Sequence, residues 1–168
     1  MKAIVVALCL AAGCGGKGTP PGGPGTPSTP GAPAIELTLP AVDGGEVSLA
    51  SHRGKIVVLH VFTTWSLAAQ AEVEALGAAD AADDVVVIGI ALDAEGRLLV
   101  APWRNGADVR YLVTVADEPT RAGQSPLGPL PAVPITIVLD RAGRIAARAD
   151  RQLTAAELDA MIATARAR

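Results

Sequence analysis

Residues 61–72 read VFTTWSLAAQAE and carry the strongest structural signal in the chain. They follow a β-branched apolar run over residues 55–62, which is typical of a central strand covered on both faces. Ser66 then precedes helix-forming residues that continue to Gly77. We expect Ser66 to be a helix N-cap, because a serine at that position accepts a hydrogen bond from the first turn. The apolar positions of this predicted helix, residues 66–77, are Leu67, Val73 and Leu76.

Alternating strands and helices are also predicted further along the chain. Residues 84–93 form a second apolar run, residues 97–104 favour a helix, and residues 109–115 favour a short strand. Because a strand, a helix and a strand follow one another, we expect the first two strands to be parallel, with a right-handed crossover.

The last third of the chain predicts a different arrangement. Residues 135–139 and 143–148 are separated by a turn at residues 140–142, which predicts an antiparallel hairpin. Thr154 and Glu157 have the spacing of a capping box, so a last helix should begin there. Its predicted buried positions are Leu158, Met161, Ile162 and Ala165. The fold class is therefore α/β, a mixed sheet flanked by helices, with a β-α-β half before a β-β-α half.

This order of elements is that of the thioredoxin fold, and residues 35–166 carry short motifs of one of its families. The chain resembles the TlpA-like membrane-anchored thiol-disulfide oxidoreductases, which are redoxins of the thioredoxin superfamily related to AhpC/TSA proteins. The motifs are DGGEVSL at 43–49, RGK at 53–55, FTTW at 62–65, Val133-Pro134 and Asp140-x-x-Gly143.

The resemblance implies two redox cysteines, and both are missing here. In the family the first cysteine lies at a helix N-terminus, where its pKa is lowered, and the second resolves the mixed disulfide. Ser66 and Ala69 occupy these positions, and the only cysteines of the chain are Cys9 and Cys14. Serine is far harder to deprotonate than cysteine, and alanine has no nucleophile. The chain is thus a degenerate member, with no catalytic residue predicted at this site.

Other enzymatic interpretations depend on the same residue. Residues 63–66 fit the Thr-x-x-Cys pattern of the peroxide-reducing peroxiredoxins, but the peroxidatic sulfur would again fall on Ser66. A serine hydrolase would need a base, and only His52 and His60 are available. We expect His60 to be a hydrogen-bonded residue of the central strand and His52 to be solvated in the preceding loop.

Metal, cofactor and nucleic-acid binding are not predicted. Two histidines eight residues apart give no zinc or copper ligand spacing. Asp83 and Asp84 are predicted to form a solvated turn. The net charge of −3 is small and no basic stripe is present, so nucleic acid is not an expected partner.

A binding face is predicted beside the degenerate site. Pro134 resembles the cis-proline of the family, whose neighbouring backbone pairs with an extended stretch of client polypeptide. Trp65, Ser66, Val133 and Pro134 are therefore the candidate partner-binding residues. The alternative is that Trp65 and Pro134 only pack the fold. Trp103, on the second helix, is expected to belong to the core.

The N-terminal region predicts export and anchoring. Residues 1–13 combine a basic residue with a short apolar stretch and end before Cys14, which resembles a lipoprotein signal peptide with Cys14 as the lipidated residue. In residues 15–33, 13 of 19 residues are Gly or Pro, so residues 14–33 should form a tether to a folded domain at residues 34–168. An ordinary secretory signal is the alternative. The predicted location is the cell envelope, lipid-anchored and facing the periplasm or exterior, with the outer membrane preferred.

Three functions remain open from the sequence. The first is a redox-inactive lipoprotein that binds an envelope protein or extended peptide, without a cofactor or metal. The second is a thiol-disulfide oxidoreductase or peroxiredoxin-type antioxidant protein of the TlpA or AhpC/TSA class. The third is a vestigial or structural lipoprotein, since a fold alone does not determine a function.

Overall fold

The computed structural model describes residues 32–168. The predicted signal segment at residues 1–13, the predicted lipidation site Cys14 and all but the last residues of the predicted tether at residues 14–33 lie outside the described residues. Within residues 32–168, no helix has both the length and the apolar character needed to cross a bilayer.

A five-stranded sheet in the order β5-β4-β3-β6-β7 forms the centre of the domain. Strand β3 (Ile56–Phe62) is its middle strand, and all seven of its residues are buried. It pairs parallel with β4 (Val85–Ala91) and antiparallel with β6 (Ile135–Leu139). Strand β5 (Leu112–Val115) is parallel to β4, and β7 (Ile145–Ala149) is antiparallel to β6. The predicted mixed sheet, the parallel pair and the hairpin are confirmed.

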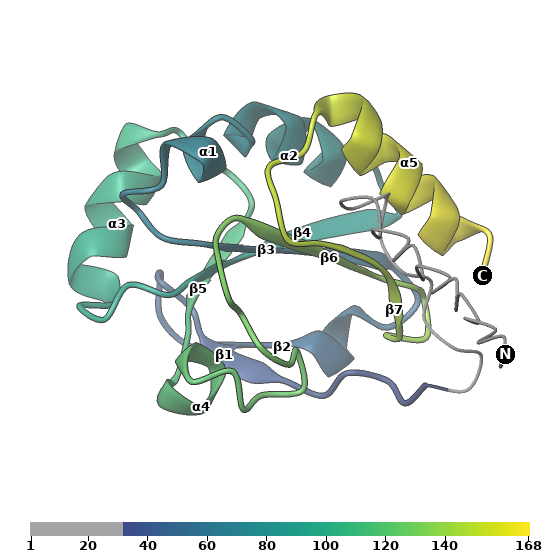
Figure 1. Ribbon diagram of the computed structural model, residues 1–168, viewed down its shortest axis with the longest axis horizontal. Coiled ribbons are helices and arrows are strands. Elements are labelled where there is room, and N and C mark those ends of the chain that lie inside the picture. Colours follow the sequence, from purple (N-terminus) through teal and green to yellow (C-terminus); the bar gives the residue numbers. More distant parts are fainter. Residues whose placement is uncertain (1–31) are drawn as a thin grey trace, which may run out of the picture.

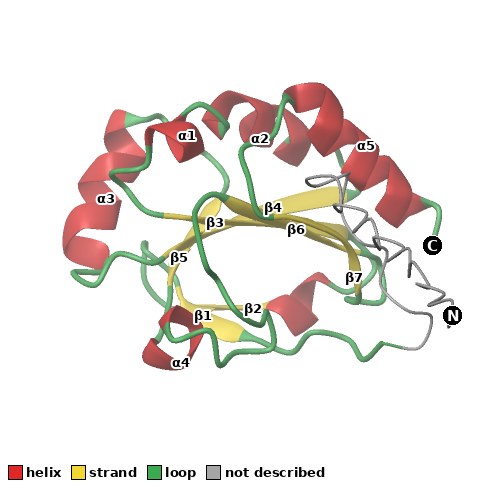
Figure 2. Cartoon of the chain, in the orientation of Figure 1, coloured by secondary structure: helices red, strands yellow, loops and turns green. Residues whose placement is uncertain are grey.

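The sheet is covered on both faces (Figure 1). One face carries the helices α1 (Leu67–Gln70), α2 (Val73–Asp80), α3 (Arg97–Gly106) and α5 (Ala155–Arg166). The other face carries a small hairpin of β1 (Thr38–Pro40) and β2 (Glu46–Ser48), a 3-10 helix (Leu49–His52) and α4 (Glu118–Arg121), as Figure 2 also shows. Each layer has its own apolar cluster, so the sheet lies between two hydrophobic cores. This arrangement confirms the thioredoxin-like fold.

Helix α5 begins as its sequence predicts. The Thr154 hydroxyl accepts a hydrogen bond from the Glu157 amide, and the Glu157 carboxylate accepts one from the Thr154 amide at 2.8 Å, so the capping box is complete. Its predicted inward positions, Leu158, Met161, Ile162 and Ala165, are all buried.

The helix predicted over residues 66–77 is wrong in its extent. Two helices, α1 and α2, replace it, and α2 runs past Gly77 to Asp80. The break falls at Ala71 and Glu72, where the Glu72 amide donates to the Ala69 carbonyl at 3.2 Å and the buried Glu72 carboxylate accepts a hydrogen bond from the Leu153 amide. Gly77 does not end the helix, since its backbone has an ordinary helical conformation and needs no glycine. Of the three apolar positions of this segment, Leu76 is buried, whereas Leu67 is 80% exposed.

Candidate functional site

Ser66 lies where β3 gives way to α1, and its hydroxyl caps the helix. The Ala69 amide donates to Ser66 Oγ at 3.2 Å, which confirms the predicted N-cap. Both residues are buried, and Ala69 is fully so. The position at which the sequence resemblance implies a nucleophilic sulfur therefore holds an oxygen that accepts a structural hydrogen bond.

Asp93 fastens the loop that carries Trp65 and Ser66 to the end of the neighbouring strand. Its carboxylate accepts the Thr64 amide at 3.0 Å and the Thr64 hydroxyl at 2.6 Å. Asp93 is 4% exposed and lies just beyond β4, the parallel neighbour of β3. Our sequence analysis missed this residue. The signal was an aspartate at the carboxyl end of a strand next to β3, where loops of a parallel pair meet.

The Val133-Pro134 peptide bond is cis, as the resemblance implied. Val61 is paired with Ile135 in the antiparallel register of β3 and β6, so Pro134 enters the sheet beside the end of β3. Pro134 is buried and Val133 is partly exposed. The structure thus places the loops of residues 63–66 and 131–134 at the same edge of the sheet, and these loops carry the four residues predicted to bind a partner.

Arg148 holds the segment that leads to Pro134. From β7 its guanidinium donates to the carbonyl oxygens of Leu127 and Pro129, each at 2.7 Å, and its Nε atom donates to Asp150 at 2.7 Å. These hydrogen bonds fix the position of a stretch that contains no strand or helix. Sequence reasoning did not find Arg148, because nothing local indicates a contact about twenty residues away.

Trp65 is not a core residue. Its side chain is 74% exposed, so it contributes little to the packing of the domain. Trp103 instead is partly buried and packs against Phe62 with the rings tilted and their centroids 4.6 Å apart, which confirms its predicted place in the core. The two tryptophans therefore differ, and only Trp65 is available to a partner.

His60 and Glu72 form a buried pair below the loop. His60 Nε2 and Glu72 Oε2 are 3.1 Å apart, and the second carboxylate oxygen accepts the Leu153 amide at 2.6 Å. The predicted hydrogen-bonded role of His60 is confirmed. Among the described residues no hydrogen bond joins either histidine to Ser66, so the geometry gives no base for a serine nucleophile.

His52 is not fully solvated, contrary to our prediction. It lies in the 3-10 helix and is partly buried. Burial and, secondly, the nearby charge of Lys55 lower its pKa. It belongs to the opposite end of β3 from Ser66, and no part of the candidate site depends on it.

The acidic turn at Asp83 and Asp84 is held by arginines. Asp84 forms ion pairs with Arg166 at 2.6 Å and with Arg141 at 3.0 Å. The hydrogen bond from Arg166 is the main cause that lowers the pKa of Asp84. Within residues 32–168, no three His, Cys, Asp or Glu side chains gather in a way that would hold a metal ion.

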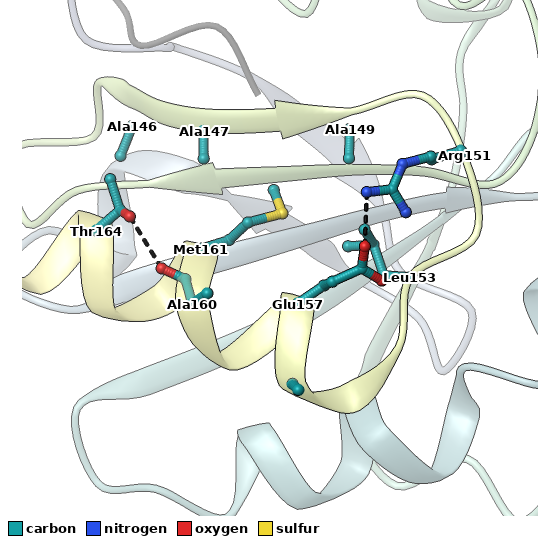
Figure 3. Close-up of a pocket in the computed structure, with 10 residues that line it drawn as sticks. Ala146, Ala147, Ala149, Arg151, Leu153, Glu157, Ala160, Met161 and Thr164 are labelled. Carbon is teal, nitrogen blue, oxygen red and sulfur yellow. Dashed lines mark hydrogen bonds and ion pairs between the residues drawn. The ribbon is translucent and has the colours of Figure 1, made fainter. Parts of the chain in front are cut away.

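A cavity of about 410 Å³ lies away from these loops, between β7 and α5. Figure 3 shows the short side chains of Ala146, Ala147 and Ala149 facing Met161 of α5, with the Arg151–Glu157 ion pair at one end. The alanines are too small to fill the space below the helix. The lining is mostly apolar and includes none of the candidate site residues.

Comparison with protein families gives one match, to the model of the AhpC/TSA family over residues 30–148. The chain belongs to the AhpC/TSA family. The redoxin resemblance of the sequence is confirmed at this level. No curated protein sequence matches the chain.

Several solved structures are similar to this AhpC/TSA chain, and three of them are described as a DsbF homologue, a thiol-disulfide isomerase and a thiol:disulfide interchange protein. A DsbF homologue from Corynebacterium diphtheriae has 28% identity and a TM-score of 0.74, covering 88% of this chain and 96% of the other. A secreted thiol-disulfide isomerase from Corynebacterium glutamicum has 21% identity and a TM-score of 0.73, with 88% and 95% covered. A thiol:disulfide interchange protein from Chlorobium tepidum TLS has 23% identity and a TM-score of 0.67, with 83% and 97% covered. At the level of family, these matches support the oxidoreductase class more than a redox-inactive protein.

Proposed function

We propose that this AhpC/TSA chain holds an extended polypeptide at the redox face of its fold without exchanging a disulfide. The observation that carries the proposal is the use of Ser66 Oγ as a helix cap beside a fully buried Ala69. Residues 15–168 contain no cysteine that could replace the missing sulfur atoms. Disulfide exchange requires a thiolate, so this part of the chain has no group to perform it.

The rest of the face is suited to binding. The Asp93 carboxylate holds the loop of residues 63–66, and the Arg148 guanidinium holds the segment that leads to Pro134. Trp65, on the first of these loops, is largely exposed to solvent. A large, exposed aromatic side chain on a rigid loop provides contact area at small entropic cost. The ladder between β3 and β6 ends at Val61 and Ile135, which leaves the backbone beside Val133 available to an added strand.

The location of the chain in the cell is also part of the proposal. The Corynebacterium glutamicum relative is described as secreted, and the N-terminal sequence of this chain resembles a lipoprotein signal. We therefore place the chain in the cell envelope, anchored through lipid on Cys14 and facing the periplasm or exterior. Its partner would be another envelope protein or an extended part of one.

A second candidate function is thiol-disulfide or peroxide chemistry of the AhpC/TSA class, which the comparisons favour. For this chain it requires a thiol supplied by another molecule. The purified protein would then be inactive alone and active with that molecule. A face that binds nothing, as in a structural lipoprotein, is the third possibility.

The test of binding is a selection of extended peptides from a display library on the wild-type chain. Enriched peptides are added to isotopically labelled protein, and amide shifts are mapped. We expect shifts in residues 63–66 and 132–135, and loss of binding in Trp65→Ala but not in Leu112→Ala, which alters an exposed leucine on β5. Absence of enriched peptides, or shifts confined to another surface, would contradict the proposal.

A further inference from the structure

We propose that the cavity between β7 and α5 binds an acyl chain, namely one carried by the lipid on Cys14 of the same molecule. Binding there shelters part of the lipid anchor from water. This inference rests on the proposed function, which places a lipid on Cys14, but it concerns a different part of the domain from the redox face.

The cavity has the size and the lining of a site for an apolar ligand. Its volume of about 410 Å³ lies within the range of about 300–1,000 Å³ that is typical of ligand sites. Figure 3 shows Ala147 and Ala149 of β7 facing Met161 of α5, whose unbranched side chain adapts to a ligand of irregular shape. Ala156 and Ala160 line the cavity and are exposed, so a ligand can enter from solvent.

The polar groups around the cavity already have partners. The Thr164 hydroxyl donates to the Ala160 carbonyl at 2.9 Å. The Glu157 carboxylate accepts hydrogen bonds from Arg151 at 2.7 Å and from the Thr154 amide at 2.8 Å. A polypeptide backbone would bring N–H and C=O groups that need partners in an apolar site, whereas an acyl chain brings none. The lining therefore favours an acyl chain over a peptide.

The cavity is a slot that runs along α5. In Figure 3, Ala146 and Thr164 lie at one end of the slot, and the ion pair of Arg151 and Glu157 lies at the other. Helix α5 rises about 10 Å between Glu157 and Thr164. A long, narrow and mostly apolar space of this kind matches an unbranched acyl chain in shape as well as in chemistry.

The described chain begins at the Thr164 end of this slot. The Ile35 amide donates to the Gly143 carbonyl at 2.7 Å, in the turn that leads into β7. The same turn contacts the end of α5, because the Arg141 guanidinium donates to the Arg166 carbonyl at 3.4 Å. Figure 1 shows the first described residues at the end of the sheet where α5 finishes. The segment that leads back to Cys14 therefore starts close to the cavity.

This segment is long enough to bring the lipid to the cavity. Residues 15–31 separate Cys14 from residue 32, where the described part of the chain begins. An extended chain of that length spans at most about 60 Å. The lining alanines of β7 lie only about 10 to 20 Å from Gly143 at the rise of a strand. A lipid on Cys14 can thus reach the slot without any change in the domain.

Occupation of the cavity would weaken the anchor. A single acyl chain holds a protein on a membrane only marginally and reversibly, and stable anchoring takes more than one chain. A lipid with several chains holds the protein less firmly while one of them lies in the cavity. The anchor would then have two states, one with every chain in the membrane and one with a chain in the protein.

The test labels the lipid and asks where it lies. A bacterial host that acylates lipoproteins produces the full chain while it grows on a fatty acid that carries a photoreactive diazirine. After irradiation of the cell envelopes, mass spectrometry locates the label on the protein. We expect label on β7 and α5 in wild type and its loss in Ala160→Phe, whose side chain fills the cavity.

The matched control is Ala163→Phe. Both alanines are exposed on α5, and only Ala160 lines the cavity, so Ala163→Phe should keep the label. Thermal unfolding of each variant shows that it is folded. Ala156→Phe replaces the second exposed alanine of the lining and gives the same test if Ala160→Phe does not fold.

The variant Cys14→Ser distinguishes the sources of the acyl chain, because it carries no lipid of its own. Label in its cavity would show that a free fatty acid or a phospholipid binds there, which contradicts the inference. Absence of label from β7 and α5 in wild type, or equal label in Ala160→Phe, contradicts it as well.

The mass of the intact wild-type protein separates the two proposals. If Cys14 carries a lipid and the cavity is unlabelled, only the acyl-chain site is wrong. If Cys14 carries no lipid, the site and the proposed anchor are both wrong. Peptide binding at the redox face is measured independently of either result.

Discussion

At the scale of single residues, the candidate site depends on Ser66 and Ala69, the two positions at which the sequence resemblance implies cysteines. Ser66 lies at the N-terminus of α1, where the resemblance implies the first cysteine. Its hydroxyl oxygen accepts a hydrogen bond from the Ala69 amide. Ala69 has become part of the core. The strand before them is regular and the Val133-Pro134 bond is cis, so we expect the fold to accept cysteines at both positions.

The double variant Ser66→Cys/Ala69→Cys should therefore form a disulfide under mild oxidation. The two side chains lie three positions apart in the first helical turn, and a disulfide needs β-carbons about 3.8 Å apart. Free thiols are counted by mass spectrometry after alkylation, with Ser66→Cys alone as the control. Two free thiols in the oxidised double variant would show that these positions do not correspond to the family's redox pair.

Removal of the Glu72 carboxylate should lower the free energy of unfolding strongly. Its carboxylate joins His60 of β3 to the Leu153 amide before α5, in a place that is 5% exposed. Glu72→Ala leaves both partners buried without an acceptor, which costs about 3 kcal/mol in the free energy of unfolding. Glu72→Gln keeps an acceptor and should lose less. Urea unfolding measures both, and equal stability of Glu72→Ala and wild type would contradict the role of this pair.

At the scale of elements, most strands were predictable and the helix after the site was not. Continuous apolar runs identify β3 and β4 because both faces of the sheet are covered. The capping box of α5 is a local signal and was found. The break between α1 and α2 falls at a carboxylate that bonds to residues on β3 and before α5, and no pattern within the helix reveals such distant partners.

The N-terminus of α5 gives a prediction on acid stability. The hydrogen bond from Arg151, followed by those from Thr154, lowers the pKa of Glu157 from its usual 4.5 to about 2. A lowered folded-state pKa stabilises the fold above pH 4.5, and this contribution is lost as the pH falls towards 2. Glu157→Gln keeps an acceptor for the cap but removes the charge. Its melting temperature should fall less steeply than that of wild type over this range, and parallel curves would contradict the assignment.

At the scale of the whole molecule, the order of short motifs in the sequence was enough to predict the fold and the family. The resemblance to the family then predicted the end of the sheet at which the candidate site lies. Asp93 and Arg148 escaped sequence reasoning because each acts across the fold, on a loop far from it in the chain. The exposed leucines of α3 also escaped, since helical periodicity predicts a buried face but not an unoccupied one.

The central claim is that this redoxin face binds without disulfide exchange, and insulin reduction tests it most directly. The purified full chain is assayed with dithiothreitol beside a buffer blank, a Cys9→Ser/Cys14→Ser variant and Ser66→Cys/Ala69→Cys. We predict that the first two match the blank and that the cysteine pair accelerates insulin precipitation. Reduction above the blank by the wild-type chain, retained in the Cys9→Ser/Cys14→Ser variant, would contradict the account and favour the oxidoreductase class.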